Sequence, residues 1–289
     1  MSDRVLAPFG RREALVTARE QHGDYVVLRA RDETGPHPAA GQFYMLSAAS
    51  RWGGGEAERP FLPRAFSVLR ATELADAGAT GMTGPGATDM TGPGTLELHF
   101  LIEDVGPGTN RLAELEPGDG LRIVGPLGLG FTPPADNRAA LLVGGGVGIA
   151  PLAIWQDQLN QPARTLLGFR DAAHAPGAQL LGDAEIATDD GSVGHHGLVT
   201  ELLRAELDAD AHRQVYACGP PSMLEAVRAL CAEREVPAQL ALESGMACGF
   251  GACFGCVVAT RSGYIRLCVD GPVLDANELE SALVPGAGH

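Results

Sequence analysis

The stretch AALLVGGGVG, residues 139–148, joins a short apolar run to a cluster of four glycines. A run of this length is typical of a buried strand, and the helix-like sequence that follows continues through Leu159. Glycines at such a junction let the backbone turn tightly, and the start of the helix presents unpaired N–H groups to an anion. The stretch therefore predicts a strand, a turn that can hold a dinucleotide pyrophosphate, and a helix. Because its spacing is not G-x-G-x-x-G, a tight turn without a ligand stays open as an alternative.

Strands and helices alternate downstream of this turn. Residues 165–169, 186–188 and 215–217 are strand-like, whereas residues 198–207 and 222–234 are helix-like. Alternation of this kind predicts a parallel sheet with right-handed crossovers. The run at 215–217 leads into Cys218, Gly219 and Pro220, at the edge of the sheet where such folds bind ligands. A buried cysteine without a ligand is the alternative interpretation of Cys218.

The sequence upstream of the turn is rich in short β-prone runs. They cover residues 14–20, 25–31, 42–48, 65–69, 96–103 and 120–124, and glycine and proline separate them. This pattern predicts a barrel or a sandwich. A local repeat, ATGMTGPG followed by ATDMTGPG, fills residues 79–94. Two copies do not make a solenoid, so we interpret the repeat as a flexible insertion at a hairpin tip.

Two motifs in this β-rich half suit the binding of a phosphate and a heteroaromatic ring. The motif RAFS, residues 64–67, combines an arginine that can pair with phosphate and a serine that can hydrogen-bond a flavin edge. The motif GPGT, residues 106–109, follows a predicted strand and offers loop N–H groups. Read alone, each also fits a plain alternative: an exposed arginine on a strand, or an ordinary turn.

Four cysteines near the end of the chain carry the most specific chemistry. The run ESGMACGFGACFGC, residues 243–256, is followed by Cys268, which gives the spacing C-x4-C-x2-C-x11-C. The first three positions have the spacing of plant-type ferredoxins, which hold a 2Fe–2S cluster. Zinc ribbons use two C-x2-C knuckles instead, and disulfides belong to oxidising compartments. We therefore favour a cluster that carries single electrons, with zinc and disulfides as alternatives.

Bulk properties exclude several other classes of protein. The chain has 289 residues, enough for two or more domains, and a net charge of −15 that argues against nonspecific binding to nucleic acid or anionic membranes. It contains no apolar stretch of 18 or more residues and its first residues lack the apolar core of a secretory signal. We therefore expect a cytoplasmic protein, in which thiols stay reduced.

With these motifs in order, the chain resembles the electron transfer subunits of NAD-dependent dihydroorotate dehydrogenases, within the ferredoxin reductase superfamily. The resemblance rests mainly on residues 243–256 together with CVDGPV at 268–273, and residues 141–152, 167–170, 190–194 and 215–223 match in order. It implies a multidomain β and α/β fold. A flavin-binding antiparallel β-barrel would span residues 1–135, a parallel-sheet NAD-binding domain residues 136–241, and a small 2Fe–2S domain residues 242–289.

The resemblance also implies which residues hold each group. FAD would be bound by Arg64, Ala65, Phe66, Ser67, Leu101, Ile102, Glu103, Gly108 and Thr109. NAD would be bound by Gly144, Gly145, Gly146, Gly148, Cys218, Gly219 and Pro220. The cluster ligands would be Cys248, Cys253, Cys256 and Cys268. Two features depart from the family pattern: Ala65 stands where proline is usual, and the insertion at 79–94 is unusual.

The chemistry of the three groups implies a role in electron transport. NAD accepts two electrons as a hydride and a cluster passes one at a time, so a flavin is needed to convert between them. In the family, a separate FMN-containing subunit oxidises dihydroorotate in pyrimidine (UMP) biosynthesis, and electrons pass through the cluster and FAD to NAD⁺. This chain would then be an oxidoreductase flavoprotein with no orotate-forming site of its own, in a heterotetramer with two chains of each subunit.

Other functions stay open on the sequence alone. The chain can be a self-contained reductase, or the electron-transfer subunit of another NAD(P)-dependent flavoenzyme such as a ferredoxin:NADP oxidoreductase or a sulfide dehydrogenase. A zinc-stabilised interaction module without enzymatic activity is a different class. Arg170 after the second α/β strand suits a 2′-phosphate, but Asp171 beside it favours a free ribose hydroxyl. The resemblance to the family favours NAD over NADP.

Overall fold

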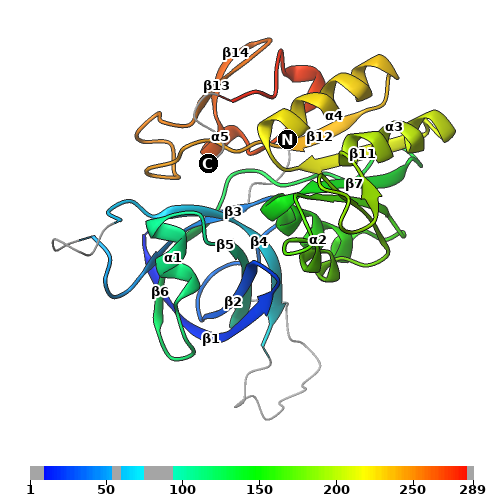
Figure 1. Cartoon of the computed structure of the whole chain (residues 1–289). Coiled ribbons are helices and arrows are strands. Elements are labelled where there is room, and N and C mark those ends of the chain that lie inside the picture. The colour runs from blue at the N-terminus through cyan, green and yellow to red at the C-terminus, as the bar shows by residue number, and fades with distance from the viewer. Residues whose placement is uncertain (1–9, 54–59, 75–93, 285–289) are drawn as a thin grey trace, which may run out of the picture.

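The computed structural model describes residues 10–53, 60–74 and 94–284 (Figure 1). The repeat at 79–94 lies outside these residues, apart from Gly94. A barrel forms one end of the molecule, a sheet with helices on both faces forms the other, and the cysteine-containing unit packs beside both (Figure 1). The cysteine-containing unit therefore contacts both the β-rich and the α/β parts of the chain.

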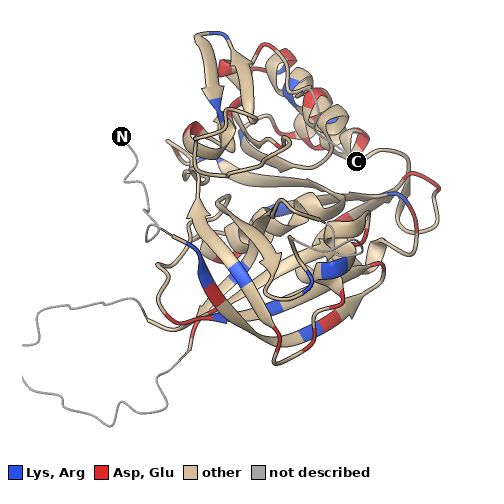
Figure 2. Cartoon of the chain, turned by 90° about the vertical axis from the view of Figure 1, so that its left-hand side faces the viewer, with Lys and Arg blue, Asp and Glu red and all other residues tan. Residues whose placement is uncertain are grey.

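The first half of the chain is a closed antiparallel barrel. Its strands are β1 (Arg12–His22), β2 (Tyr25–Asp32), β3 (Phe43–Ala48), β4 (Arg64–Glu73), β5 (Leu96–Glu103) and β6 (Gly120–Leu127), in the order β1-β2-β5-β4-β3-β6. Pairing of β1 with β6 closes it. The alternative of a sandwich is thus excluded, and each β-prone run becomes a strand. Acidic and basic residues share the outer face of the barrel, as Figure 2 shows, for example in the pair of Arg29 with Glu20 at 2.6 Å.

One element of the barrel was not predicted. The segment GPGT, interpreted as a loop, begins the short helix α1 (Pro107–Ala113). Proline suits the first turn of a helix because it has no N–H to leave unpaired. The Thr109 hydroxyl also accepts hydrogen bonds from the N–H groups of Val105 and Gly106, at 2.9 and 3.0 Å. These local bonds convert the turn into a helix start, which spacing alone did not reveal.

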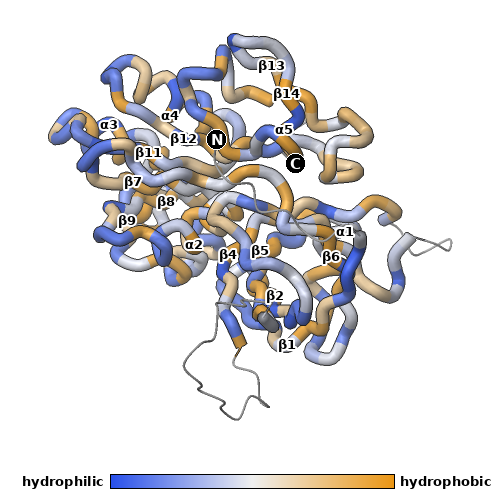
Figure 3. Tube along the Cα trace, turned by 180° about the vertical axis from the view of Figure 1, so that it is seen from behind, coloured by the Kyte–Doolittle hydropathy of each residue, from blue (hydrophilic) through white to orange (hydrophobic). Residues whose placement is uncertain are grey.

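The second half contains a seven-stranded sheet in the order β10-β9-β8-β7-β11-β12-β15. The strands are β7 (Ala139–Gly145), β8 (Arg164–Phe169), β9 (Ala184–Thr188), β10 (His195–His196), β11 (Arg213–Cys218), β12 (Ala238–Ala241) and β15 (Val273–Asp275). All pairs from β10 to β12 are parallel, as the alternation predicted, and β15 adds to the edge in the antiparallel direction. Hydrophobic residues, orange in Figure 3, recur along the strands of the barrel and of the seven-stranded sheet.

Helices cover both faces of this sheet (Figure 1). The short helix η1 (Gly146–Ile149) leads into α2 (Ala150–Gln158), which packs towards the barrel, and a second short helix, η2 (Ala175–Leu180), follows β8. Helices α3 (Val199–Ala209) and α4 (Pro221–Glu233) cover the opposite face. Leu142 and Leu167 therefore join one core with the barrel, whereas Leu141 and Leu166 join a second core with α3 and α4.

The cysteine-containing unit is small and packs against the sheet. It comprises the hairpin β13 (Val257–Thr260) and β14 (Gly263–Arg266), the short helix α5 (Leu267–Asp270), strand β15, and η3 (Ala276–Glu278). Its buried residues, including Val258 and Leu267, share the second core with α4. Because β15 pairs with β12, the unit is continuous with the sheet. Within the described residues, no helix is long and apolar enough to cross a membrane.

Glu225 on α4 fastens the last described residues to the helix. Its carboxylate accepts hydrogen bonds from Arg228, from Ser281 Oγ at 3.1 Å and from the Ala282 N–H at 2.6 Å. The Arg228 guanidinium, together with the Ala282 and Ser281 donors, lowers the pKa of this carboxyl from 4.5 to about 2 despite partial burial. The ionised form is therefore bound more tightly in the folded chain than in the unfolded one.

We expect Glu225→Gln to lower the free energy of unfolding by about 1–3 kcal/mol at pH 7. Because the folded-state pKa is depressed, the wild-type contribution is complete above about pH 4.5 and is lost as the pH falls towards 2. Urea unfolding across this range measures it. Glu233→Gln, on the same helix with a 64% exposed side chain, is the control. Identical curves for Glu225→Gln and the wild type would contradict this role.

Candidate functional site

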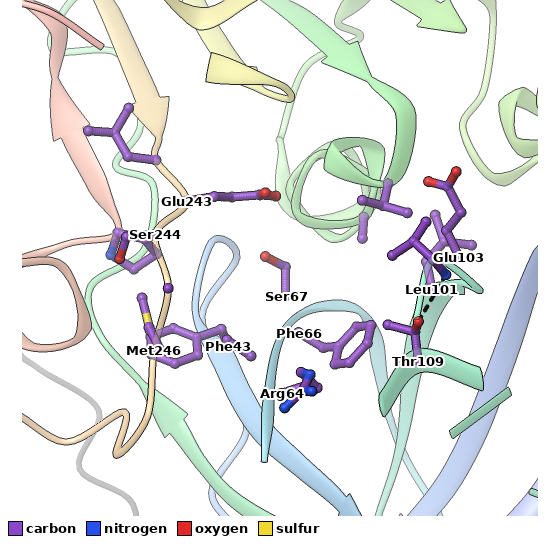
Figure 4. Close-up of a pocket in the computed structure, with 17 residues that line it drawn as sticks. Phe43, Arg64, Phe66, Ser67, Leu101, Glu103, Thr109, Glu243, Ser244 and Met246 are labelled. Atoms are coloured by element: carbon purple, nitrogen blue, oxygen red, sulfur yellow. Dashed lines mark hydrogen bonds between the residues drawn. The ribbon is translucent and has the colours of Figure 1, made fainter. Parts of the chain in front are cut away.

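Two adjoining cavities lie between the barrel, the sheet and the start of the cysteine-containing unit. The first, here named the barrel cavity, has a volume of about 270 Å³ (Figure 4). Strand β4, the end of β5, helix α1, the start of α2 and residues 242–246 line it. Of the residues predicted to bind FAD, the cavity wall contains Arg64, Ala65, Phe66, Ser67, Leu101, Glu103 and Thr109. Residues from three distant parts of the sequence therefore meet in one space.

Arg64 presents a cation to the barrel cavity. Its Nη1 donates to the Leu62 carbonyl at 2.7 Å, and it has no carboxylate partner within the described residues. Its guanidinium lies against Gly108, where a Cβ atom would come within 2.6 Å of Arg64 Nε. Gly108 therefore brings α1 and Arg64 together rather than lining the cavity itself. A guanidinium without a protein counter-ion is well suited to bind a phosphate group.

The other walls suit a flat ring with polar edges. In Figure 4 the Ser67 hydroxyl, from β4, and the Glu243 carboxylate, from the segment after β12, project into the same space. The Ser244 hydroxyl is buried without a hydrogen-bond partner in the described structure, which leaves it free to bond a ligand. Ile102 is fully buried in the barrel core, so its side chain faces away from the cavity. These residues fit a flavin.

The second cavity, here named the glycine-turn cavity, has a volume of about 440 Å³. Gly145, Gly146 and Gly148 line it together with Gly219 and Pro220, so five of the predicted NAD-binding residues are brought together. The two segments touch, because a Cβ atom on Gly148 would lie 2.6 Å from the Cys218 carbonyl. Gly146 has a left-handed backbone with φ of 54°, and a side chain there would meet only Tyr25, at 3.8 Å. The turn thus leaves room for a pyrophosphate.

Two predicted NAD-binding residues lie behind the wall of the glycine-turn cavity. Gly144 is buried in β7, where a Cβ atom would press on Leu167 at 2.9 Å. Cys218 is 2% exposed, and burial, with a smaller effect of the nearby Glu243 charge, raises the pKa of its thiol. Its side chain therefore stays protonated, and only the backbone of Cys218 can shape the site.

Four residues line both cavities and mark their junction: Glu103, Val105, Val147 and Glu243. The sequence patterns gave no site role to Val105, Val147 or Glu243, and they indicated Glu243 only as the first residue of the cysteine run. Glu243 follows β12 at the carboxyl edge of the sheet, and that position was the available signal. Its side chain is exposed to the cavities, although the surrounding protein desolvates the carboxyl and so raises its pKa.

A polar network crosses from the barrel to the sheet at this junction. Arg170 Nη2 donates to Glu103 Oε1 at 2.5 Å and to His174 Nε2 at 2.6 Å. His174 Nδ1 in turn donates to Asp171 Oδ1 at 2.7 Å, and this hydrogen bond lowers the pKa of Asp171. Arg170 and Asp171 were considered above as residues that select between a 2′-phosphate and a ribose hydroxyl. In the structure, Arg170 binds Glu103 and His174, and Asp171 binds His174. Arg170 still lines the glycine-turn cavity, and Asp189, the residue after β9, lines it in place of Asp171.

The cysteine loop surrounds its sulfur atoms with backbone N–H groups. The Cys253 N–H donates to Cys248 Sγ at 3.4 Å, and the Gly255 N–H donates to Cys253 Sγ at 3.4 Å. Partial burial disfavours the Cys248 thiolate, but the N–H groups of Cys253, Phe250 and Ala252, with the Cys253 thiol, outweigh it and lower the pKa of Cys248 to about 7. Positive φ values at Gly249 and Gly251, 79° and 88°, bend the loop around the sulfurs. Such an N–H-rich loop stabilises thiolates.

The four cysteines approach one another in two pairs. Cys248 contacts Cys253, and Cys256 contacts Cys268, where burial and then the neighbouring Cys256 raise the pKa of Cys268 to about 12. In the described residues, no group of three or more His, Cys, Asp or Glu side chains is placed to hold a metal ion. A 2Fe–2S cluster takes two thiolates on each of two irons, and these two pairs of cysteines supply that set of ligands.

The cysteine loop lies directly beside the barrel cavity. Met246 lines that cavity, and Cys248 follows two residues later. A Cβ atom on Gly249 would come within 2.5 Å of Met45 on β3, so the loop packs tightly on the barrel. The sites suited to a dinucleotide, a flavin and a cluster therefore follow one another in space.

The barrel, the parallel sheet and the cysteine-containing unit together form a ferredoxin reductase-like fold. An NADH-dependent reduced ferredoxin-NADP oxidoreductase has the same fold, with a TM-score of 0.68, 24% identity and coverage of 93% of this chain and 90% of that one. The ferredoxin reductase of carbazole 1,9a-dioxygenase is also similar, with a TM-score of 0.56, 21% identity and coverage of 78% and 66%.

The sequence comparisons narrow this class. The iron-sulfur cluster binding domain of dihydroorotate dehydrogenase B matches residues 243–280. The dihydroorotate dehydrogenase B (NAD(+)) electron transfer subunit of Caldanaerobacter subterraneus subsp. tengcongensis is 35% identical over 253 residues, 84% of this chain and 87% of that protein. The Geobacillus kaustophilus subunit is 42% identical over 187 residues, 60% and 70% of the two chains. The chain belongs to the family of these electron transfer subunits.

We expect Arg64→Ala to weaken FAD binding by about tenfold or more, the effect of losing one charge-assisted hydrogen bond to phosphate. Flavin released on dilution, followed by fluorescence, measures it. Arg122→Ala, on β6 of the same barrel and outside the cavity wall, is the control. Equal flavin retention in Arg64→Ala and the control would remove Arg64 from the phosphate site.

Proposed function

We propose that this chain is the electron transfer subunit of an NAD-dependent dihydroorotate dehydrogenase. Electrons from the FMN of a catalytic partner subunit pass through the 2Fe–2S cluster and FAD to NAD⁺, as a step of UMP biosynthesis. One observation carries the proposal: residues 242–246 line the barrel cavity, Glu243 also lines the glycine-turn cavity, and the same segment runs into Cys248. The similarity to the electron transfer subunits named above supports it.

Each group has a proposed place in the chain. Residues 1–135 hold FAD in the barrel cavity, residues 136–241 hold NAD in the glycine-turn cavity, and residues 242–289 hold the cluster on Cys248, Cys253, Cys256 and Cys268. When bound, the flavin supplies the conversion between hydride and single-electron transfer. The protein's own part is to bind and orient these groups and to keep water from the junction, where Val105 and Val147 supply apolar surface.

Glu243 holds a carboxyl group where the two cavities meet. Its raised pKa follows from the protein around it, and it forms no hydrogen bond or ion pair with another described side chain. A carboxyl in this setting can hold a proton beside the place where two rings are brought together. We therefore assign Glu243 to the junction rather than to the cluster unit.

The glycine-turn cavity favours NAD over NADP. The chain has 21 basic residues, and all of them are arginine. Among the residues that line this cavity, Arg170 is the one arginine, and Glu103 neutralises it. Asp189 adds an exposed carboxylate with no side-chain partner among the described residues. A carboxylate accepts a hydrogen bond from a ribose 2′-hydroxyl and repels a 2′-phosphate.

We expect Asp189→Ser to lower kcat/KM for NADH by about tenfold and to raise the NADPH:NADH ratio, because a charge-assisted acceptor is lost. Oxidation of both nucleotides by the FAD-loaded chain, with ferricyanide as acceptor, measures the ratio. Asp190→Asn is the matched control, since the Asp190 carboxylate binds its own turn through the Ser192 N–H at 2.9 Å. An unchanged ratio in Asp189→Ser would place the ribose elsewhere.

An exposed apolar surface surrounds the cysteine loop. Phe254 is 62% exposed and Tyr264 is 81% exposed, and Phe250 and Val257 extend this surface. Cys253 is exposed beside it. Large aromatic side chains grouped on a surface mark a protein interface. We propose this surface, Phe250, Phe254, Val257 and Tyr264, as the face that binds the catalytic subunit, in a cytoplasmic heterotetramer with two chains of each subunit.

Co-expression with the FMN-containing catalytic subunit tests the function. We expect a complex that reduces NAD⁺ with dihydroorotate and contains about two irons and two acid-labile sulfides for each copy of this chain. Phe254→Asp should prevent assembly by placing a charge in the interface. Leu15→Asp, at a 42% exposed leucine on the barrel, should assemble normally.

The outcomes separate the alternatives. If the chain instead assembles with a different partner that accepts or donates electrons, the assignment to dihydroorotate oxidation would be wrong, but the role in electron transfer would stand. Zinc without sulfide would favour a zinc-stabilised interaction module and contradict the cluster. Assembly of both variants with equal affinity would move the interface away from the cysteine loop.

A further inference from the structure

Arg266 connects three parts of the cysteine-containing unit. It ends β14, two residues before Cys268. Its Nη1 donates to the Gly251 carbonyl at 3.1 Å, and its Cζ lies 5.2 Å from the centroid of the Phe254 ring. Its Nε lies 3.9 Å from Asp270 Oδ2, an oxygen that also accepts the Arg266 backbone N–H at 3.0 Å. The side chain is therefore held in one place over the loop.

The peptide that Arg266 holds belongs to the cysteine loop and acts on its sulfurs. The carbonyl of Gly251 and the N–H of Ala252 belong to one planar peptide group, so they point in opposite directions. The carbonyl accepts from Arg266, and the N–H of Ala252 favours the thiolate of Cys248. The Gly251 N–H favours the thiolate of Cys268 in the same way. A hydrogen bond to the carbonyl polarises the peptide and strengthens the one that its N–H makes.

Gly251 has little freedom to turn this peptide away. Its φ is 88°, and a Cβ atom there would lie 2.6 Å from Val269 Cγ2 and 3.3 Å from Arg266 Nη1. The loop thus approaches Arg266 as closely as a residue without a side chain allows. Both N–H groups, towards Cys248 and Cys268, depend on the same fixed backbone.

We propose that Arg266 is a positioning residue that raises the reduction potential of the cluster. This inference rests on the proposed function, since it requires a cluster on the four cysteines. Hydrogen bonds to the sulfurs and nearby positive charge both stabilise the reduced, more negative form. Arg266 provides both, because it orients the Gly251–Ala252 peptide and places a cation beside the loop. A higher potential lets the cluster accept electrons more readily from a partner.

The position of Arg266 also links this effect to the exposed surface. The guanidinium lies over Phe254, whose ring is 62% exposed at the proposed interface. A partner that covers Phe254 removes water from the same guanidinium and strengthens its electrostatic effect. Arg266 is therefore placed to adjust the cluster when the catalytic subunit binds.

The test is a redox titration of the cluster in the full-length chain, followed by electron paramagnetic resonance. We expect Arg266→Gln to leave on the order of tenfold less reduced cluster at a fixed ambient potential, a decrease of about 59 mV for a one-electron couple. Arg266→Lys keeps the charge and should restore most of the potential. Arg261→Gln removes the same charge from the β13–β14 turn, where its backbone N–H binds the Glu278 carbonyl, and should match the wild type.

Each outcome decides between roles. A wild-type potential in Arg266→Gln, with the cluster spectrum intact, would overturn the proposal. An equal decrease in Arg261→Gln would show an effect of net charge alone and would also overturn it. Should Arg266→Gln fail to hold the cluster, Phe254→Leu, which removes only the ring under the guanidinium, must lower the potential in the same direction. A wild-type chain that binds no iron would instead contradict the proposed function itself.

Discussion

The five residues from Leu242 to Met246 are the constraint on which the rest of the arrangement depends. They leave β12 at the carboxyl edge of the sheet, line the barrel cavity and lead into Cys248. Glu243 in this segment also faces the glycine-turn cavity. Electron transfer needs its carriers close together, and here one short length of backbone connects all three sites. A shift of this segment would move the cysteine loop relative to both cavities.

A polar contact where the cavities meet fixes the position of the barrel relative to the sheet. Glu103 at the end of β5 accepts from Arg170 after β8, and His174 connects Arg170 to Asp171. Tyr25 on β2 packs edge-on against His174 with ring centroids 5.5 Å apart. A network with every member partnered favours a single arrangement of the two domains. Because Glu103 neutralises Arg170 in the same contact, Arg170 does not favour the 2′-phosphate of NADP.

The sequence predicted the fold well because its signals are local. Apolar runs, glycine turns and alternating strands and helices identified the barrel strands and β7, β8, β9 and β11 of the parallel sheet within a few residues, but not β10 or β12. It missed α1, because the helix start depends on hydrogen bonds of the Thr109 hydroxyl and on the missing N–H of Pro107, which a pattern of apolar residues does not contain. It also treated the cysteine segment as separate, although β15 returns to pair with β12. Pairing between distant segments has no local signature.

The sequence by itself determined which chemistry the chain can perform, because the cysteine spacing, the glycine turn and Arg64 are properties of short segments. Only the tertiary structure decided which residues share a wall. It placed Glu243 at the junction of the cavities, moved Gly144 and Cys218 behind the surface, and replaced Asp171 by Asp189 at the dinucleotide cavity. The physical reason is that burial and proximity depend on how distant segments pack, whereas residue type and spacing do not.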